Sequence, residues 1–301
     1  MRFDPTAFAG VHTAIVTPVR DDKVDFAALE RVVERQIAGG IHGLVPCGTT
    51  GESSTLSAAE KLEVIAATVR FAAGRCKVIA GVGTNDTAAS LVASRMALDV
   101  GADAGLVITP YYNKPTPAGL YHHFRTLAEG VPDLPFVLYN VPSRTSVSFD
   151  VPTVERLADL PNIVALKEAT GDLKFDAKLV SAVGDRMILL SGDDATALPL
   201  WCVGGRGLIA VITNLIPDRV VSMWQAYERG DLAGARRLHL QLMPLFEGLF
   251  LETSPGPVKA VLSWMEKGIR PDMRLPLVPI EPGTEGKLRA LCEQLEVPLA
   301  Q

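Results

Sequence analysis

Short apolar runs alternate with longer amphipathic runs along most of the chain, and glycine, proline or aspartate separates each pair. Short bounded apolar runs are typical of buried strands, and helical spacing of apolar positions in the longer runs is typical of surface helices. Residues 26–38 (FAALERVVERQIA) show this helical spacing and are followed by Gly39 and Gly40, which favour the end of a helix. Ser57 and Glu60 form a capping-box pattern that predicts the start of another.

The alternation predicts a repeating strand–helix architecture. Strands are predicted at 11–16, 43–46, 77–82, 104–108, 136–139, 163–167, 187–191 and 207–212. Helices are predicted after them at 26–38, 57–73, 87–99, 116–129, 151–159, 173–182, 193–202 and 217–229. A set of eight such units favours a closed (β/α)8 barrel, the TIM barrel, which typically takes about 250 residues. A doubly wound open sheet is the alternative.

The strand pattern stops after Gly230. Residues 235–250, 257–268 and 285–297 instead have the spacing of three further helices. We therefore expect an α/β fold with the barrel in residues 1–230 and a C-terminal helical region, 231–301, packed on it. Because no low-complexity linker separates the two regions, one compact body is expected.

The composition of the chain mainly excludes classes of function and of binding partner. The formal net charge of −5 gives no basic footprint for nucleic acid or an anionic membrane surface. No run approaches the ~20 apolar residues of a membrane span, and the N-terminus lacks the pattern of a signal peptide. The four cysteines are scattered without a CxxC pair, so we expect no zinc site, no disulfide framework and a cytoplasmic protein. A small, possibly anionic, substrate is left as the expected partner.

Lys167 stands at the end of an apolar run, which is an unusual place for a lysine. If residues 163–167 form a strand, Ala165 and Lys167 share one face and Glu168 lies on the other. Burial would lower the pKa of the lysine, and the neutral amine could then form an imine with a carbonyl compound. A lysine that reaches out to water or pairs with a carboxylate is the alternative.

Other chemically capable residues follow the predicted strands, where the active sites of TIM barrels lie. They are the loop Gly48–Ser53, Tyr111 and Tyr112, Tyr139 and Arg144, and the segment Ser191–Asp194. The glycines and hydroxyls of the first loop suit a carboxylate, and the loop lacks the GK[ST] of a phosphate loop. Tyr139 could donate or relay a proton, and Arg144 could bind a carboxylate through two hydrogen bonds. Each of these could instead be an ordinary core, capping or surface residue.

Taken in order, these motifs resemble those of the dihydrodipicolinate synthases, within the pyruvate-dependent class I aldolases that include N-acetylneuraminate lyase. The matching motifs are GTTGES (48–53), TPYYNKPT (109–116), LYNVPSRT (138–145), VALKEATGD (164–172) and LLSGDDA (189–195), and the match runs over nearly the whole chain. The resemblance implies a TIM barrel with a helical C-terminal extension and a Schiff base between Lys167 and pyruvate. It implies no metal and no organic cofactor, because the protein's own amine is the electron sink.

The resemblance also implies a role for each site residue. Tyr139 would transfer protons at the imine, linked through Thr50 to Tyr112 of a neighbouring subunit in a homotetramer built as a dimer of dimers. Thr49 and Thr50 would bind the pyruvate carboxylate, with Gly192 and Ile209 lining the pocket, and Arg144 would hold the carboxylate of the second substrate. The implied reaction joins pyruvate and L-aspartate 4-semialdehyde to give 4-hydroxy-tetrahydrodipicolinate, on the route to diaminopimelate and lysine.

Two alternatives stay open at this point. The nearer one is a related aldolase acting on a sugar acid or hydroxy-oxo acid, from which Arg144 in NVPSRT best separates this sequence. The other is a barrel without catalytic activity that binds 2-oxo acids, although such a protein would not need Lys167, Tyr139, Thr50 and Tyr112 together.

Feedback inhibition by lysine is expected to be weak or absent. Ser53, Asn85 and Tyr111 match the lysine-binding cleft of inhibited family members. Ala58, Lys61 and Ala89, however, stand where such enzymes commonly carry histidine, histidine and glutamate. The missing carboxylate at 89 removes a partner for the ammonium of lysine, and Lys61 adds like charge.

Overall fold

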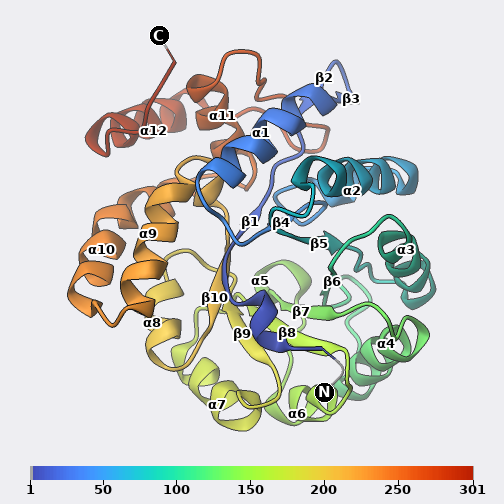
Figure 1. Ribbon diagram of the computed structural model, residues 1–301. Helices are drawn as coiled ribbons and strands as arrows, with labels where there is room; N and C mark the ends of the chain where they lie inside the picture. Colours follow the sequence, from blue (N-terminus) through green and yellow to red (C-terminus); the bar gives the residue numbers. More distant parts are fainter. Residues whose placement is uncertain (1–2, 301) are drawn as a thin grey trace. The chain divides into compact units, whose positions relative to one another are not determined.

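The computed structural model describes residues 3–300 and shows parallel strands closed into a barrel and surrounded by helices (Figure 1). Around the ring, the strand order is β1-β10-β9-β8-β7-β6-β5-β4. The barrel strands are β1 (Gly10–Ala14), β4 (Gly43–Val45), β5 (Lys77–Gly81), β6 (Ala104–Ile108), β7 (Phe136–Asn140), β8 (Ile163–Glu168), β9 (Ile188–Ser191) and β10 (Gly207–Ala210). The predicted TIM barrel is confirmed, and the open sheet is wrong because the ring of strands closes.

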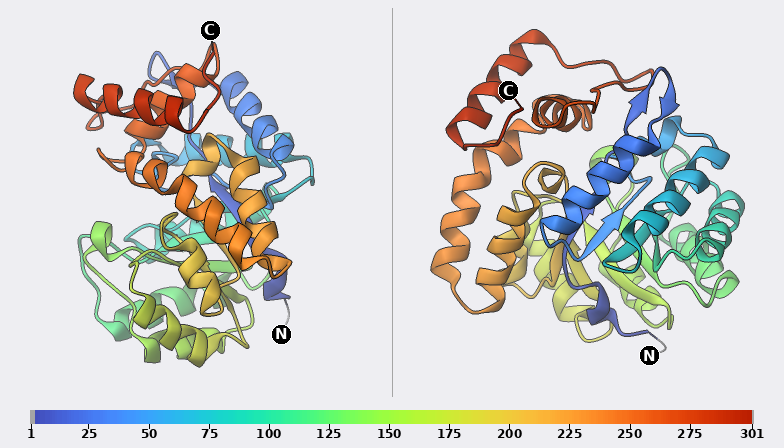
Figure 2. Two further views of the ribbon diagram at one scale, coloured as in Figure 1. Left: turned by 90° about the vertical axis from the view of Figure 1, so that its left-hand side faces the viewer. Right: turned by 45° about the horizontal axis from the view of Figure 1, so that its top comes forward.

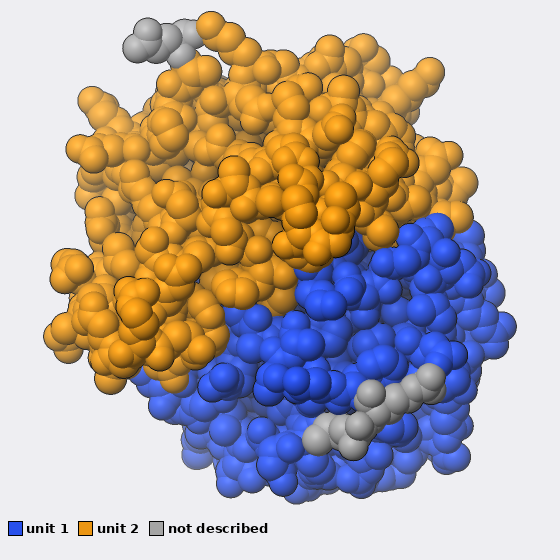
Figure 3. Space-filling model, in the orientation of Figure 1, with its two compact units in different colours: residues 1–10, 77–209 blue, residues 11–76, 210–301 orange. Residues whose placement is uncertain are grey.

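By its internal contacts the chain divides into two compact units (Figure 3). Unit 1 comprises residues 1–10 and 77–209, and unit 2 comprises residues 11–76 and 210–301. This division differs from the boundary predicted after residue 230, which follows the end of the strand pattern and stays a prediction.

Unit 1 contains the run of strands from β5 to β10. Parallel pairing is recorded for β5 with β6, β6 with β7, β7 with β8, β8 with β9 and β9 with β10. The helices that follow these strands are α3 (Thr87–Asp99), α4 (Pro117–Gly130), α6 (Val151–Ala158), α7 (Leu173–Val183) and α8 (Ala197–Cys202). In this order each helix packs on the next, so that one face of each is buried.

Side-chain caps mark the start of α3, α4, α6 and α7 in unit 1. Asp86, Thr116, Asp150 and Asp172 each accept a hydrogen bond from a backbone N–H in the first turn of the following helix. Such caps satisfy N–H groups that have no partner inside the helix, and each contributes about 1 kcal/mol. Each cap therefore fixes the residue at which the preceding βα loop ends and the helix begins.

Unit 2 contains β1 and β4, which pair in parallel, and the helices at both ends of the chain. These helices are α1 (Phe26–Ala38), α2 (Ala58–Ala72), α9 (Pro217–Glu228), α10 (Leu232–Gly248), α11 (Gly256–Met265) and α12 (Pro282–Gln294). α10 packs on both α9 and α12, and α11 and α12 lie side by side in the two views of Figure 2. The predicted helical C-terminal region is confirmed.

The sequence patterns located most elements to within a few residues. The helices predicted at 26–38 and 87–99 have these bounds, and the capping box of Ser57 and Glu60 is present. The unpredicted features include the hairpin of β2 (Val19–Arg20) and β3 (Lys23–Val24), and the one-turn helix α5 (Pro142–Thr145). Both are too short to show periodicity. Within residues 3–300, none of the helices combines the length and apolar character that a membrane span requires.

Candidate active site

Lys167 lies near the end of β8 and is only 6% exposed. Every residue of this strand is buried, as its apolar sequence predicts. Parallel pairing places Lys167 beside Tyr139 of β7 on one side and Leu190 of β9 on the other. The lysine Nζ lies 4.2 Å from the centre of the Tyr139 ring. The structure therefore brings an amine and a phenol together in a largely buried setting.

Gly192 follows β9 and adjoins the side chain of Lys167. A Cβ added at this position would lie 2.7 Å from the Cβ of Ala169 and 3.0 Å from the Cε of Lys167. The amide of Gly192 donates to the carbonyl of Glu168 at 2.6 Å, which holds the two strand ends together. A glycine is required here because any side chain would displace the lysine. Ile209, also predicted to line the pocket, is fully buried in β10.

Arg144 lies in the helix α5 that directly follows β7 and Tyr139. Its side chain is exposed, while the neighbouring Thr145 is buried. The Thr145 hydroxyl accepts a hydrogen bond from the hydroxyl of Thr109 and donates to the carbonyl of Val147. The loop is thus held by its buried threonine, and the guanidinium is left accessible to a ligand.

Tyr111 and Tyr112 lie in the loop after β6, and Tyr112 is 89% exposed. Tyr112 has a φ of +71°, a left-handed conformation that is unfavourable for a bulky residue. The side chain of Asn113 donates to the carbonyl of Asn85 at 2.8 Å, which joins this loop to the one that follows β5. The segments carrying Tyr111 and Asn85, both predicted for an allosteric cleft, are therefore close together.

The loop Gly48–Ser53 follows β4 in unit 2. Thr50 is buried, whereas Thr49 and Ser53 are partly exposed. A Cβ at Gly51 would lie 3.0 Å from the amide nitrogen of Cys47, so only glycine fits without a shift. The carbonyl of Gly51 accepts a hydrogen bond from the hydroxyl of Thr17 at 2.8 Å. Within the loop, the amides of Glu52 and Ser53 donate to the carbonyls of Thr49 and Gly48, so the loop is folded tightly on itself.

A buried ion pair that the sequence patterns did not reveal supports the same loop. Glu52 pairs with Lys259 of α11, and both side chains are almost fully buried. The Lys259 ammonium also donates to the carbonyl of Thr17, while the other oxygen of Glu52 accepts from the backbone of Arg274. Burial lowers the pKa of Lys259, and the charge of Glu52 opposes this shift. A lysine in the apolar run PVKAVL was the one available signal.

A second buried polar group lies on the outer face of the strands that carry Lys167 and Tyr139. Glu168 is 2% exposed and accepts hydrogen bonds from Asn140 and from the amide of Thr170. Burial raises the pKa of Glu168, and these hydrogen bonds act in the opposite direction. Asp176 of α7 is also buried, and burial, aided by the charges of Glu168 and Asp172, raises its pKa to about 7.

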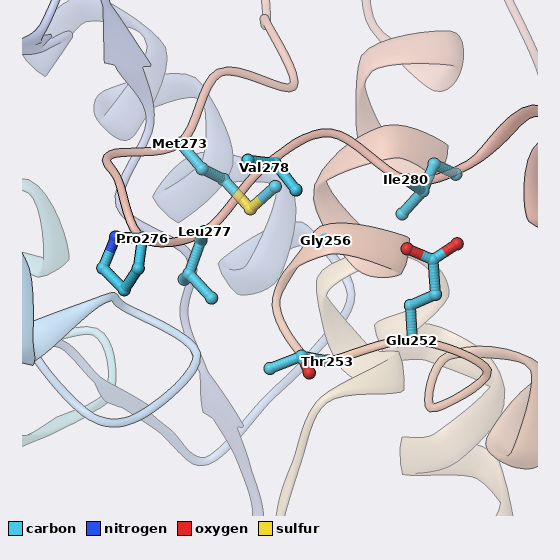
Figure 4. A pocket seen from close by; sticks show the side chains of 8 residues that line it. All are labelled: Glu252, Thr253, Gly256, Met273, Pro276, Leu277, Val278 and Ile280. Atoms are coloured by element: carbon cyan, nitrogen blue, oxygen red, sulfur yellow. The ribbon is translucent and has the colours of Figure 1, made fainter.

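A separate pocket lies in the C-terminal part of unit 2 (Figure 4). Its volume is about 300 Å³, and its lining consists of Glu252, Thr253, Gly256, Met273, Pro276, Leu277, Val278 and Ile280. The Glu252 carboxylate accepts a hydrogen bond from the amide of Glu281 at 3.0 Å, so it is used in holding the pocket's own wall. None of the residues predicted for the active site lines this pocket.

A family model described as the dihydrodipicolinate synthetase family matches residues 7–295. The chain belongs to this family. A 4-hydroxy-tetrahydrodipicolinate synthase from Syntrophobacter fumaroxidans is 45% identical over 282 residues, which cover 94% of this chain and 97% of the relative. The dihydrodipicolinate synthase of Aquifex aeolicus has a similar structure, with a TM-score of 0.94 and 42% identity over 98% of this chain and all of that one.

A further member of the dihydrodipicolinate synthetase family connects the fold to a ligand. The chloride-inhibited dihydrodipicolinate synthase of Acinetobacter baumannii, whose crystal structure is a complex with pyruvate, has a TM-score of 0.92 and 41% identity to this chain. The similarity covers 96% of this chain and 99% of that one. The family resemblance inferred from the motifs is thus confirmed.

Proposed function

We propose that this chain is a lyase that condenses pyruvate with L-aspartate 4-semialdehyde to give 4-hydroxy-tetrahydrodipicolinate, in diaminopimelate and lysine biosynthesis. The observation that carries the proposal is the buried amine of Lys167, 4.2 Å from the ring centre of Tyr139, in a chain of this family. The relatives named 4-hydroxy-tetrahydrodipicolinate synthase support the reaction, and the relative in complex with pyruvate supports the first substrate.

The first step forms a covalent bond to Lys167. Its neutral amine attacks the keto carbon of pyruvate, and the former carbonyl oxygen leaves as water, which gives a protonated imine. This cation withdraws electrons from the neighbouring methyl group, so a methyl proton can be lost and an enamine forms. The chain's own amine supplies the electron sink, and no metal or organic cofactor enters this scheme.

We propose that Tyr139 transfers the proton that moves between the methyl group of pyruvate and the solvent. A phenol beside the imine can accept and donate protons in turn. We assign the rest of the relay to Thr50 and to Tyr112 of a neighbouring subunit in a homotetramer built as a dimer of dimers. The 89% exposure and the strained backbone of Tyr112 in the single chain support a role against another subunit.

The two carboxylates of the substrates need positive or hydrogen-bonding groups. Thr49 and Thr50 are the proposed ligands of the pyruvate carboxylate, with Gly192 and Ile209 beside the bound molecule. All four follow or end parallel strands, and in TIM barrels such positions form the active site. Arg144, on the exposed loop after Tyr139, is the proposed ligand of the semialdehyde carboxylate, because a guanidinium binds a carboxylate through two hydrogen bonds.

The later steps return Lys167 to its free state. The enamine carbon attacks the aldehyde carbon of the semialdehyde and forms the new carbon–carbon bond, while the aldehyde oxygen takes up a proton. The amine of the second substrate then attacks the imine carbon, the ring closes, and the Lys167 nitrogen leaves. Atoms and electrons balance without an oxidant or reductant.

Trapping with borohydride tests the covalent step. Pyruvate with borohydride should add a single three-carbon adduct to the wild type, and peptide mapping should locate it at Lys167. Lys167→Ala should give no adduct, while Arg144→Ala should still be trapped because Arg144 acts on the second substrate. An adduct elsewhere, or none in the wild type, would contradict the proposal.

The choice of acceptor is tested separately by assays with aspartate semialdehyde, N-acetylneuraminate and 2-oxo-3-deoxygluconate. We expect turnover of aspartate semialdehyde in the presence of pyruvate, and no turnover of either sugar acid. Turnover with a sugar acid but not with the semialdehyde would instead identify a related aldolase. Trapping of pyruvate without any turnover would favour a barrel that only binds 2-oxo acids.

We also propose a cytoplasmic location and weak or absent inhibition by lysine. The four cysteines are all free thiols, which fits a reducing compartment. Ser53, Asn85 and Tyr111 would contribute to a lysine site, but Ala89 offers no carboxylate for the ligand's ammonium. Lysine at millimolar concentration should leave the rate nearly unchanged, and a rate halved by it would overturn this proposal.

A further inference from the structure

The ends of β7 and β8 carry two residue pairs in register. Tyr139 lies opposite Lys167, and the next residues along the strands, Asn140 and Glu168, lie opposite one another. Because side chains alternate along a strand, the second pair points away from the face that carries the amine and the phenol. One face of these strand ends therefore carries the proposed catalytic pair, Lys167 and Tyr139. The other face carries Asn140 and Glu168, which have no role in the reaction proposed above.

The outer pair is hydrogen bonded and buried. The Nδ2 of Asn140 donates to the Oε2 of Glu168 at 2.7 Å, and the two residues are 0% and 2% exposed. A polar group buried in this way is costly to leave without its partner, because water cannot replace the bond. Backbone bonding adds to it, since the amide of Ala169 donates to the carbonyl of Asn140 at 3.0 Å.

Both residues also reach beyond the pair. The Oδ1 of Asn140 accepts from the amide of Phe149 at 3.2 Å, which closes the loop that carries Arg144. The Oε1 of Glu168 accepts from the amide of Thr170, and the carbonyl of Glu168 accepts from the amide of Gly192. The pair thus fixes the ends of β7 and β8 together with the loops that leave them.

We propose that Asn140 and Glu168 are positioning residues whose hydrogen bond fixes the distance between the Lys167 amine and the Tyr139 phenol. This inference rests on the proposed function and deepens it. Imine formation depends little on the pair, since pyruvate is a mobile ligand that can reach a displaced amine. Proton transfer to the phenol depends on it strongly, because both groups are then fixed to the two strands that the pair joins.

Asn140→Ala tests the inference, with Asn162→Ala as its matched control. Asn162 is 2% exposed, and its side chain donates to the carbonyls of Ala128, Val131 and Leu134. It immediately precedes β8, so the control removes a similarly buried asparagine at the other end of the strand that carries Lys167 and Glu168. Two readouts are compared in the full-length protein: pyruvate trapped on Lys167 by borohydride, and exchange of the pyruvate methyl protons with D2O, followed by NMR without any aldehyde.

We expect Asn140→Ala to retain trapping while methyl-proton exchange falls by about 10²-fold, the effect of a displacement of roughly 1 Å between reacting groups. Asn162→Ala should lower the melting temperature but retain both trapping and exchange. Equal exchange rates per trapped site in the two variants would overturn the inference, because the loss would then reflect general destabilisation.

Two further outcomes are distinguishable. If Asn140→Ala does not fold, Asn140→Leu serves instead, because leucine fills the volume of asparagine but has no N–H to donate to Glu168. The same loss of exchange with trapping retained is expected, and exchange unchanged from the wild type would overturn the inference. If the wild type neither traps pyruvate nor exchanges its protons, the proposed function fails and this inference fails with it.

Discussion

At the scale of single residues, the site depends on the missing side chain of Gly192 as well as on the buried side chain of Lys167. Gly192 leaves the space that the Lys167 side chain occupies, and a single methyl group would intrude on it at 3.0 Å. Lys167 is itself buried, with its amine beside the ring of Tyr139. Neither effect involves a long-range rearrangement, so each can be tested by one substitution.

Gly192→Ala should reduce pyruvate trapping on Lys167. The added methyl contacts the Cε of Lys167 and the Cβ of Ala169 and takes up space beside the amine where pyruvate is proposed to bind, so the rate should fall by at least about 10-fold. Trapped adduct measured by intact mass against time checks this. Gly286→Ala is the control, because it lies in α12 with nothing within 4 Å and should leave trapping unchanged. Equal trapping rates in both variants would contradict the prediction.

Asp176→Asn should stabilise the protein at alkaline rather than acidic pH. The pKa of Asp176 is raised from 3.8 to about 7, so the folded state holds a proton that the unfolded state has lost between these values. Stability contributed by this group therefore falls as the pH rises through that window. One buried oxygen of Asp176 has no hydrogen-bond partner among the described residues, which adds to the cost of the charge.

Thermal denaturation near pH 5 and near pH 8 measures this effect. Asparagine resembles the protonated acid, so the melting temperature of Asp176→Asn should exceed that of the wild type by several degrees at the higher pH and by less at the lower pH. A difference that is independent of pH would show that packing, rather than ionisation, governs the effect.

At the scale of elements, unit 2 holds the loop after β4 by an ion pair with a helix far along the chain. Glu52 adopts a left-handed backbone conformation, with a φ of +55°, and turns its carboxylate toward Lys259 of α11. The carboxylate is also bonded to the backbone of Arg274, which in turn pairs with Glu60 of α2. The loop carrying Thr49 and Thr50 is therefore held from the C-terminal helices and not only by its own turn.

Lys259→Met should lower the free energy of unfolding by about 3–5 kcal/mol, because it leaves the Glu52 charge buried without its partner. The double variant Lys259→Met with Glu52→Gln should recover much of this loss, since no uncompensated charge is left. Urea denaturation of the wild type, both single variants and the double variant measures the coupling. Arg125→Ala, which breaks the exposed pair of Arg125 and Glu129, is the control and should have little effect. Additive losses in the double variant would contradict the role of the pair.

At the scale of the whole molecule, the closed ring of parallel strands sets the direction of every strand and so collects the loops that follow them. Tyr112 is an aromatic residue that is strongly exposed in the single chain. In the proposed assembly it enters the site of another subunit, so that catalysis and association become linked.

Mixing two inactive or weakened variants tests this link. Tyr112→Phe and Lys167→Ala subunits, unfolded together and refolded into hybrids, should regain activity above the sum of the separate variants. In a hybrid, the intact Tyr112 of the Lys167→Ala subunit would complete the site that still has its lysine. Additive activity in hybrids verified by mass spectrometry would place Tyr112 in its own subunit's site or outside the mechanism.

The sequence by itself determined the order and type of the elements and the presence of a lysine in an apolar strand. Helical and strand periodicities are local properties, and so α1 and α3 were located to the residue. The contacts of the site are not local. Whether Tyr139 lies beside Lys167 depends on the register of two strands. Whether Glu52 meets Lys259 depends on how the fold brings together two residues that are 207 positions apart in the sequence. Tertiary packing alone decided these pairs, because burial leaves each polar group only the partners that the fold brings to it.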